Sequence, residues 1–126
     1  MCLVGDTFLM RSSQWTTTKH LHIVIAKEQD LILLVNLTSH KDGCENDCIL
    51  KTGEHPFLDR NSMVNYMDAI ITSTSKLKNG IGLKVIFQRE KLSDSVLHRV
   101  QESGLNSRAI SRKNKEFLDN YLKNKN

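Results

Sequence analysis

This 126-residue sequence contains few of the features that mark specialised protein classes. No apolar run reaches the ~18 residues that a membrane-spanning helix requires. The N-terminal stretch, MCLVGDTFLM, lacks the positive charge that opens a signal peptide. Its three cysteines are an odd number, which fits a disulfide scaffold poorly. We therefore expect a single cytoplasmic domain, residues 1–126, with one hydrophobic core and no membrane contact.

Several catalytic signatures are also missing from the sequence. No HExxH pattern is present, which argues against a zinc hydrolase with a helical metal site. No nucleophile-elbow motif supports Ser/His/Asp catalysis. No glycine-rich loop of the phosphate-binding kind occurs, so nucleotide binding of that type is unsupported.

Positive charge is concentrated at the C-terminal end. Residues 1–103 hold 12 Lys and Arg against 12 Asp and Glu, so the net charge of +4 comes from residues 104–126. This basic segment either contacts phosphates or forms a solvated helix face, and the sequence leaves both interpretations open.

The pattern of β-branched residues and turns predicts a mostly β chain followed by helices. The segment 19–26 alternates in its apolar residues, and a tight polar turn at 27–30 predicts an antiparallel hairpin with the next strand. A long strand over 61–74 is expected to bend near Met67-Asp68. We expect strands at Cys2–Met10, Lys19–Ala26, Leu31–Thr38, Cys48–Lys51, Asn61–Thr74 and Ile81–Arg89.

Two helices are expected after these strands. Ser93 is a suitable N-cap for a helix over Lys91–Ser103 that ends at Gly104, and a second amphipathic helix is expected to start near Ser107. The order predicts an α+β, mostly β fold: a small antiparallel β-barrel over about residues 1–90 with C-terminal helices over about 91–123.

Residues with hydroxyl, imidazole and thiol side chains cluster in the segment 30–57, where a core strand ends in Thr38-Ser39-His40. Two cysteines and two histidines in this segment could hold a structural zinc ion in a tetrahedral site, with His22 as a further neighbour. The alternatives are reduced cysteines in a loop or a reversible Cys44–Cys48 disulfide. The candidate zinc ligands are Cys44, Cys48, His40 and His55.

The preceding strand carries His20 and His22 on one face, two residues apart. Such a pair can reach one phosphate or one metal ion, or it can simply lie on the sheet surface. Trp15, alone in a polar segment, either stacks on a nucleic-acid base or folds back on the core.

Five segments, in the same order, give the sequence a resemblance to PemK/MazF-type toxins. Gly5-Asp6 resembles the "GD" that opens that family. HLHIVIA and VNLTS resemble two of its strands, and FLDRNSMVNYMDAIITSTSKL and IGLKVIFQREKLSDSVLHRV resemble its later segments. The resemblance covers most of residues 3–103.

The resemblance implies an SH3-like barrel that forms homodimers, cuts single-stranded RNA without a metal and is inhibited by a cognate antitoxin. The family's conserved Thr matches Thr38, with Ser39 beside it. The family's catalytic Arg falls on His20, preceded by Lys19, and Leu21 takes the place of the family's Pro.

RNA cleavage through the 2′-hydroxyl needs a base, an acid and cations. Histidine, with an ordinary pKa of about 6.5, can act as acid or base at neutral pH. We therefore predict a toxin-like endoribonuclease that requires no cofactor for catalysis. The alternative is a non-catalytic nucleic-acid- or protein-binding module of the same fold with a zinc-stabilised Cys/His loop. The predicted catalytic residues are His20, Thr38, Ser39 and Lys19, and the predicted substrate-binding residues are His22, Trp15 and His40.

Overall fold

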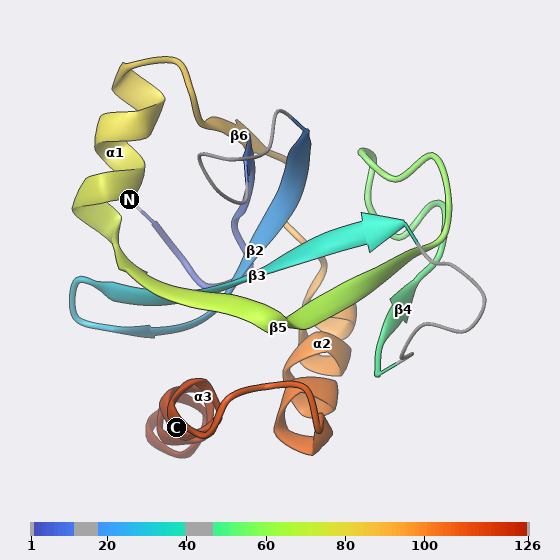
Figure 1. The fold of residues 1–126 in the computed structure, drawn as a ribbon, viewed down its shortest axis with the longest axis vertical. Helices are drawn as coiled ribbons and strands as arrows, with labels where there is room; N and C mark the ends of the chain where they lie inside the picture. The colour runs from blue at the N-terminus through green and yellow to red at the C-terminus, as the bar shows by residue number, and fades with distance from the viewer. Residues whose placement is uncertain (1, 12–17, 40–46, 126) are drawn as a thin grey trace.

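The computed structural model describes residues 2–11, 18–39 and 47–125, and these form one curled antiparallel sheet with three helices (Figure 1). The strand order is β4-β5-β3-β2-β1-β6. The expected α+β, mostly β class is confirmed, with a sheet that curls as half a barrel. The elements are β1 (Thr7–Arg11), β2 (Lys19–Glu28), β3 (Leu31–Ser39), β4 (Ile49–Leu50), β5 (Ser62–Ser73), α1 (Thr74–Gly82), β6 (Phe87–Arg89), α2 (Asp94–Asn106) and α3 (Arg112–Asn124).

The expected hairpin of β2 and β3 is confirmed and forms the centre of the sheet. Glu28 pairs with Leu31, and Gln29 between them takes a left-handed backbone (φ 53°). Residues 21–26 and 32–37 are buried without interruption, because both faces of these strands are covered.

The long strand β5 is bent where the sequence predicted a bend. Leu34 pairs with Ile70, but Asn36 pairs with Asn65, so β5 accommodates extra residues at this point. Asp68 closes the bulge, because its backbone N–H donates to the Asn65 side chain at 3.3 Å. This bend lets β5 follow the curl of the sheet.

The prediction of a strand over Ile81–Arg89 is wrong for most of these residues. Residues 74–82 form α1 instead, with Ser73 as its N-cap accepting from the Lys76 N–H, and only Phe87–Arg89 are extended. Ile86 packs against Gly80, where a Cβ would lie 2.3 Å from Ile86 Cδ1. This close approach turns the chain back toward β1.

The two C-terminal helices are confirmed with shifted ends. Ser93 caps α2 as predicted, but the helix continues through Gly104, which is buried against Leu118 and Tyr66. The second helix starts after Ser111 rather than near Ser107. A side chain at position 104 would crowd Leu118 of α3 and Tyr66. This close packing, rather than the end of a helix, explains why the residue there is glycine.

Helices cover both faces of the sheet, and the two faces carry cores of different size. The larger core lies between the sheet and α2 and α3, and the smaller one lies under α1 (Figure 1). The helices of the described residues include none that is long and apolar enough to cross a membrane.

Candidate functional site

The strands β2 and β3 diverge toward one end of the sheet (Figure 1). A hollow lined by residues of both strands opens there. Their pairing ends at His22 and Asn36, although both strands run on beyond these residues. Past this point, the Leu37 carbonyl lies 3.1 Å from His20 Nδ1. The strand ends are therefore joined by a side chain, and their polar residues face a common opening.

The hollow has a volume of about 360 Å³ and brings together four residues that the sequence nominated: Lys19, His20, Thr38 and Ser39. Two strands supply these four, and the connection between β4 and β5 supplies the opposite wall. The remaining lining residues are Thr18, Leu21, Leu37, Phe57, Leu58, Asp59, Arg60 and Ser62.

The hydrogen bond of His20 determines how its imidazole can react. A carbonyl oxygen only accepts, so Nδ1 carries the proton and donates to the Leu37 carbonyl. In the neutral ring, Nε2 then carries the lone pair. His20 is thus held in the tautomer that a general base needs.

His22 is on the same strand but does not line the hollow. It is 4% exposed, and its Nδ1 lies 3.0 Å from the His20 carbonyl, to which it donates. Burial lowers the pKa of His22 below its ordinary value, so the ring is neutral at pH 7. These contacts make His22 a support for the backbone at His20.

His55 fixes the wall of the hollow that faces the strands. The Phe57 N–H donates to its Nδ1 at 3.0 Å, so Nε2 carries the proton and donates to the Glu90 carbonyl at 2.6 Å. The Thr7 hydroxyl donates to the same carbonyl at 2.7 Å. His55 therefore joins the β4–β5 connection to the end of β6.

A second contact attaches this connection to α2. The Arg99 guanidinium donates to both Glu54 carboxylate oxygens at 2.8 and 2.7 Å, and to the Ile49 carbonyl at 3.1 Å. The hydrogen bonds from Arg99 hold the pKa of Glu54 below its ordinary value. The segment bearing Phe57 and Arg60 is thus anchored on both sides.

The structure describes two of the four candidate zinc ligands. Cys48 is a free, buried thiol, and both ring nitrogens of His55 are hydrogen-bonded within the fold. A metal at His55 would have to displace one of these bonds. No set of three or more His, Cys, Asp or Glu that could hold a metal occurs among the described residues. His40 and Cys44 lie outside them, as does Trp15, so the zinc site stays a prediction.

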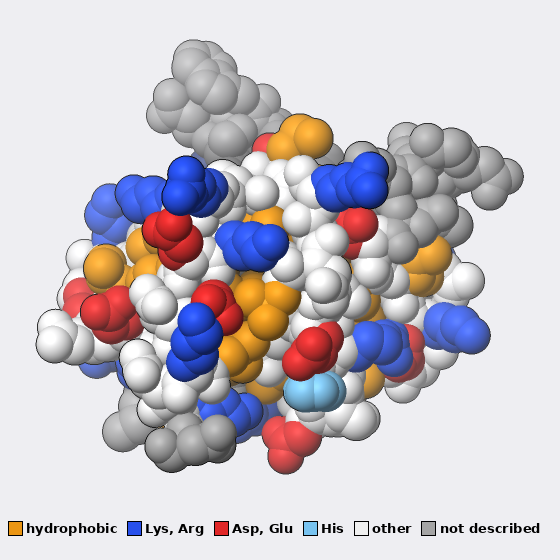
Figure 2. Space-filling model, turned by 90° about the horizontal axis from the view of Figure 1, so that it is seen from below, with side chains coloured by type: hydrophobic (Ala, Val, Ile, Leu, Met, Phe, Trp, Pro, Cys, Tyr) orange, Lys and Arg blue, Asp and Glu red, His pale blue; other side chains and the backbone are white. Residues whose placement is uncertain are grey.

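The basic C-terminal segment comprises the end of α2, the turn that follows it and α3. Two of its cations are paired with acids one turn away, Arg112 with Glu116 and Lys123 with Asp119. Figure 2 shows this side of the molecule, where basic and acidic side chains alternate. The surface resembles a solvated helix face more than a continuous basic stripe.

Sequence reasoning missed Phe57, Asp59 and Arg60 as parts of the site. They belong to a connection whose position depends on the contacts of His55 and Glu54 with distant strands and helices.

Comparison of the sequence with protein-family models and with curated proteins gave no match.

Proposed function

We propose that this protein is a metal-independent endoribonuclease that cuts single-stranded RNA at the hollow between β2 and β3, on an SH3-like barrel of the PemK/MazF type. The observation that carries the proposal is that Lys19, His20, Thr38 and Ser39 line one hollow. These residues were selected from the sequence alone, and they come from two strands that diverge at this point. The half-barrel curl of the sheet agrees with the proposed fold.

The chemistry follows from the position of His20. Nε2 removes the proton of a ribose 2′-hydroxyl, and the 2′-oxygen forms a bond to the adjacent phosphorus. The bond from phosphorus to the 5′-oxygen breaks, and the leaving oxygen takes up the proton that the imidazolium returns. The products are a 2′,3′-cyclic phosphate and a 5′-hydroxyl.

Cations and hydroxyls of the hollow stabilise the charge that develops on phosphorus. Lys19 supplies an ammonium group from β2, and Thr38 and Ser39 supply hydroxyl donors from β3. Arg60 offers a guanidinium from the opposite wall, and it is held beside Asp59 by an exposed ion pair of 3.3 Å. A cation from another segment thus compensates for the family Arg that is replaced by His20.

The resemblance adds the partners to this proposal. A cognate antitoxin would place an extended, acidic tail in the RNA-binding groove, and the active form would be a cytoplasmic homodimer. Because the hollow is lined by Lys19 and Arg60, an acidic tail fits its charge.

The test is incubation of the purified protein with a long single-stranded RNA in the presence of a chelator, with mapping of cut sites and end groups. We expect discrete cuts that leave 2′,3′-cyclic phosphates. His20→Ala should slow cleavage by about 10²- to 10⁴-fold, the usual contribution of a general base. His98→Ala is the matched control, because His98 is 70% exposed on α2.

Two results would contradict the proposal in different ways. Cleavage that survives both His20→Ala and Thr38→Ala would show that the site is elsewhere. RNA that stays intact at high protein concentration would instead favour a non-catalytic module that binds nucleic acid or protein through the same hollow.

A further inference from the structure

Two phenylalanine rings flank the hollow, and each already holds a cation against its face. Lys19 Nζ lies 4.6 Å from the ring centroid of Phe87, and Arg89 Cζ lies 5.3 Å from the ring centroid of Phe57. Lys19 and Phe57 also line the hollow. The two cation–aromatic pairs are therefore continuous with the site rather than separate features of the surface.

The strand register places these groups on the same face of the sheet. Leu9 of β1 pairs with Leu21 on one side and with Phe87 on the other, so the three side chains point the same way. Lys19 is two residues from Leu21, and Arg89 is two residues from Phe87, so they share that face. The aromatic and basic groups thus follow one path from the hollow to the edge strand β6.

The ring of Phe87 is accessible to a ligand. It is 40% exposed, on a three-residue strand at the edge of the sheet. Phe57 is half-buried at the rim of the hollow. An exposed aromatic side chain beside a cation does not contribute much to the core, and its ring can stack on a flat partner.

The charges along this path define the partner. Arg11, Lys19, Arg60 and Arg89 are its cations, whereas Asp59 and Glu90 are its acids, and each acid pairs with the neighbouring arginine at the surface. Exposed pairs of this kind exchange readily for other anions. A ligand that offers successive phosphates and exposed flat rings is a single-stranded nucleic acid, because a duplex buries its ring faces.

We infer that Phe57 and Phe87 are base-stacking residues, and that a single strand crosses the mouth of the sheet from the hollow to β6, with Lys19 and Arg89 on its phosphates. The inference rests on the proposed function and deepens it, because it names the residues that hold the nucleotides beside the cut site. Stacking on phenylalanine accepts any base, so these contacts bind the strand without selecting its sequence.

Binding can be measured without cleavage, using a fluorescein-labelled oligodeoxynucleotide that has no 2′-hydroxyl. Fluorescence anisotropy gives the dissociation constant for the full chain and for Phe87→Leu and Phe57→Leu, which keep an apolar side chain and remove the ring. We expect each to bind about 5- to 100-fold more weakly. Phe87→Tyr should restore most of the affinity, since it keeps the stacking surface.

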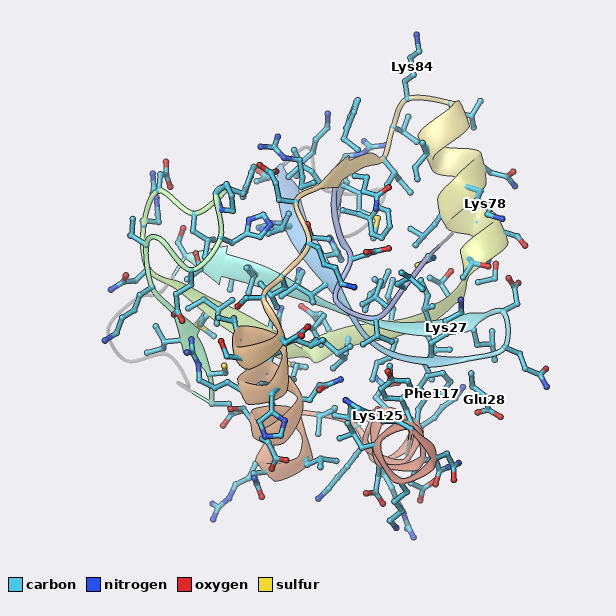
Figure 3. The ribbon with its side chains drawn as sticks, turned by 180° about the vertical axis from the view of Figure 1, so that it is seen from behind. Lys27, Glu28, Lys78, Lys84, Phe117 and Lys125 are labelled. Atoms are coloured by element: carbon cyan, nitrogen blue, oxygen red, sulfur yellow. The ribbon has the colours of Figure 1, made fainter. Side chains whose placement is uncertain are left out.

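Matched controls lie close by, outside the path. Leu83→Ala removes an apolar side chain that is 76% exposed in the connection between α1 and β6. Lys84→Ala removes a lysine at the tip of the same connection (Figure 3). Both should leave the dissociation constant unchanged within about twofold, whereas Lys19→Ala and Arg89→Ala should each reduce the slope of log affinity against log salt by about 0.7.

The outcomes separate this inference from the proposed activity. Weaker oligonucleotide binding by Phe87→Leu, in a protein that does not cut RNA, supports the stacking path and rejects the nuclease. RNA cleavage with unchanged binding by both leucine variants rejects the path alone. Polyglutamate could instead displace the labelled oligonucleotide as well as an unlabelled oligonucleotide does, while both leucine variants keep the dissociation constant of the parent protein. This result would identify an acidic peptide as the ligand and overturn the inference. If Phe57→Leu fails to fold, the dissociation constant of Phe87→Leu alone tests the inference, because Phe87 is exposed and its replacement does not disturb the core.

Discussion

His55 connects two segments of the chain through one side chain. It is 2% exposed, it receives the Phe57 N–H at Nδ1, and it donates from Nε2 to the Glu90 carbonyl. Buried polar groups are stabilising only when they are fully paired. His55 meets this condition, and so it fixes the connection that carries Phe57 and Arg60 against the last strand.

Replacing His55 by alanine should destabilise the protein. The Phe57 N–H loses its acceptor and a cavity forms, for which we expect a loss of about 2–4 kcal/mol in the free energy of unfolding. Urea denaturation followed by circular dichroism measures this loss. His98→Ala, at an exposed histidine, should cost less than about 0.5 kcal/mol. Equal effects of the two substitutions would show that His55 does not hold the wall.

The polar residues at two strand ends, taken together with the resemblance to PemK/MazF-type toxins, nominated Lys19, His20, Thr38 and Ser39. These residues lie at the ends of two strands that the apolar pattern predicts, so their proximity follows from the hairpin. Phe57 and Arg60 could not be found in the same way. Their place depends on hydrogen bonds to residues 35 and 45 positions away, and no local pattern encodes such contacts.

At the scale of elements, the connection between β4 and β5 behaves as a structured wall. Two of its backbone N–H groups donate hydrogen bonds to side chains of the same connection. The Lys51 N–H donates to Glu54 Oε1 at 2.8 Å, and the Thr52 N–H donates to Asn61 Oδ1 at 3.2 Å. Glu54 then pairs with Arg99 of α2. One carboxylate therefore organises the turn and attaches it to the helix.

The ion pair of Glu54 and Arg99 should make stability depend on pH. The pKa of Glu54 is lower in the folded protein than in the unfolded chain, where it is about 4.3, so the stabilisation is complete above that value. It is lost as the pH falls through the lowered pKa. Because the two side chains are 24% and 44% exposed, we expect at most about 1 kcal/mol.

Urea denaturation of Arg99→Ala and the parent protein at a series of pH values measures this contribution. The difference between them should be largest near neutral pH and should shrink below about pH 4. Arg112→Ala is the matched control, since Arg112 is 93% exposed in its pair with Glu116. A difference that stays constant down to pH 2 would assign the effect of Arg99 to packing or to its bond with the Ile49 carbonyl.

Elements with a clear period were predictable, and so was the short edge strand β4, whereas the segment that leads into the other edge strand, β6, was not. The hairpin and α2 have strong apolar patterns, and the structure contains both. Residues 74–82 contain a Lys-Asn-Gly turn signal, but the Ser73 cap and the contact of Ile86 with Gly80 favour a helix. Tertiary packing therefore determines the conformation of this segment. It also explains why Gly104 lies inside α2 rather than after its end.

At the scale of the whole molecule, the sheet separates two cores of unequal size. The larger core includes side chains from the sheet, α2 and α3, with Tyr66 at its centre, whose hydroxyl donates to the Val100 carbonyl at 2.7 Å. The smaller core lies under α1, which contributes Leu77 and little else. We therefore expect α1 to open independently while the rest of the fold stays intact.

Two leucine truncations of identical chemistry test this asymmetry. Leu118 of α3 is fully buried, and Leu77 of α1 is 3% exposed, so burial alone predicts the same cost for Leu→Ala at both. We expect Leu118→Ala to lower the global free energy of unfolding by about 2–5 kcal/mol, because the large core is needed for all elements. Leu77→Ala should instead reduce amide protection within residues 74–82 and change the global value less. Native-state hydrogen exchange separates the two effects, and a uniform loss of protection in Leu77→Ala would mean that α1 unfolds only with the whole domain.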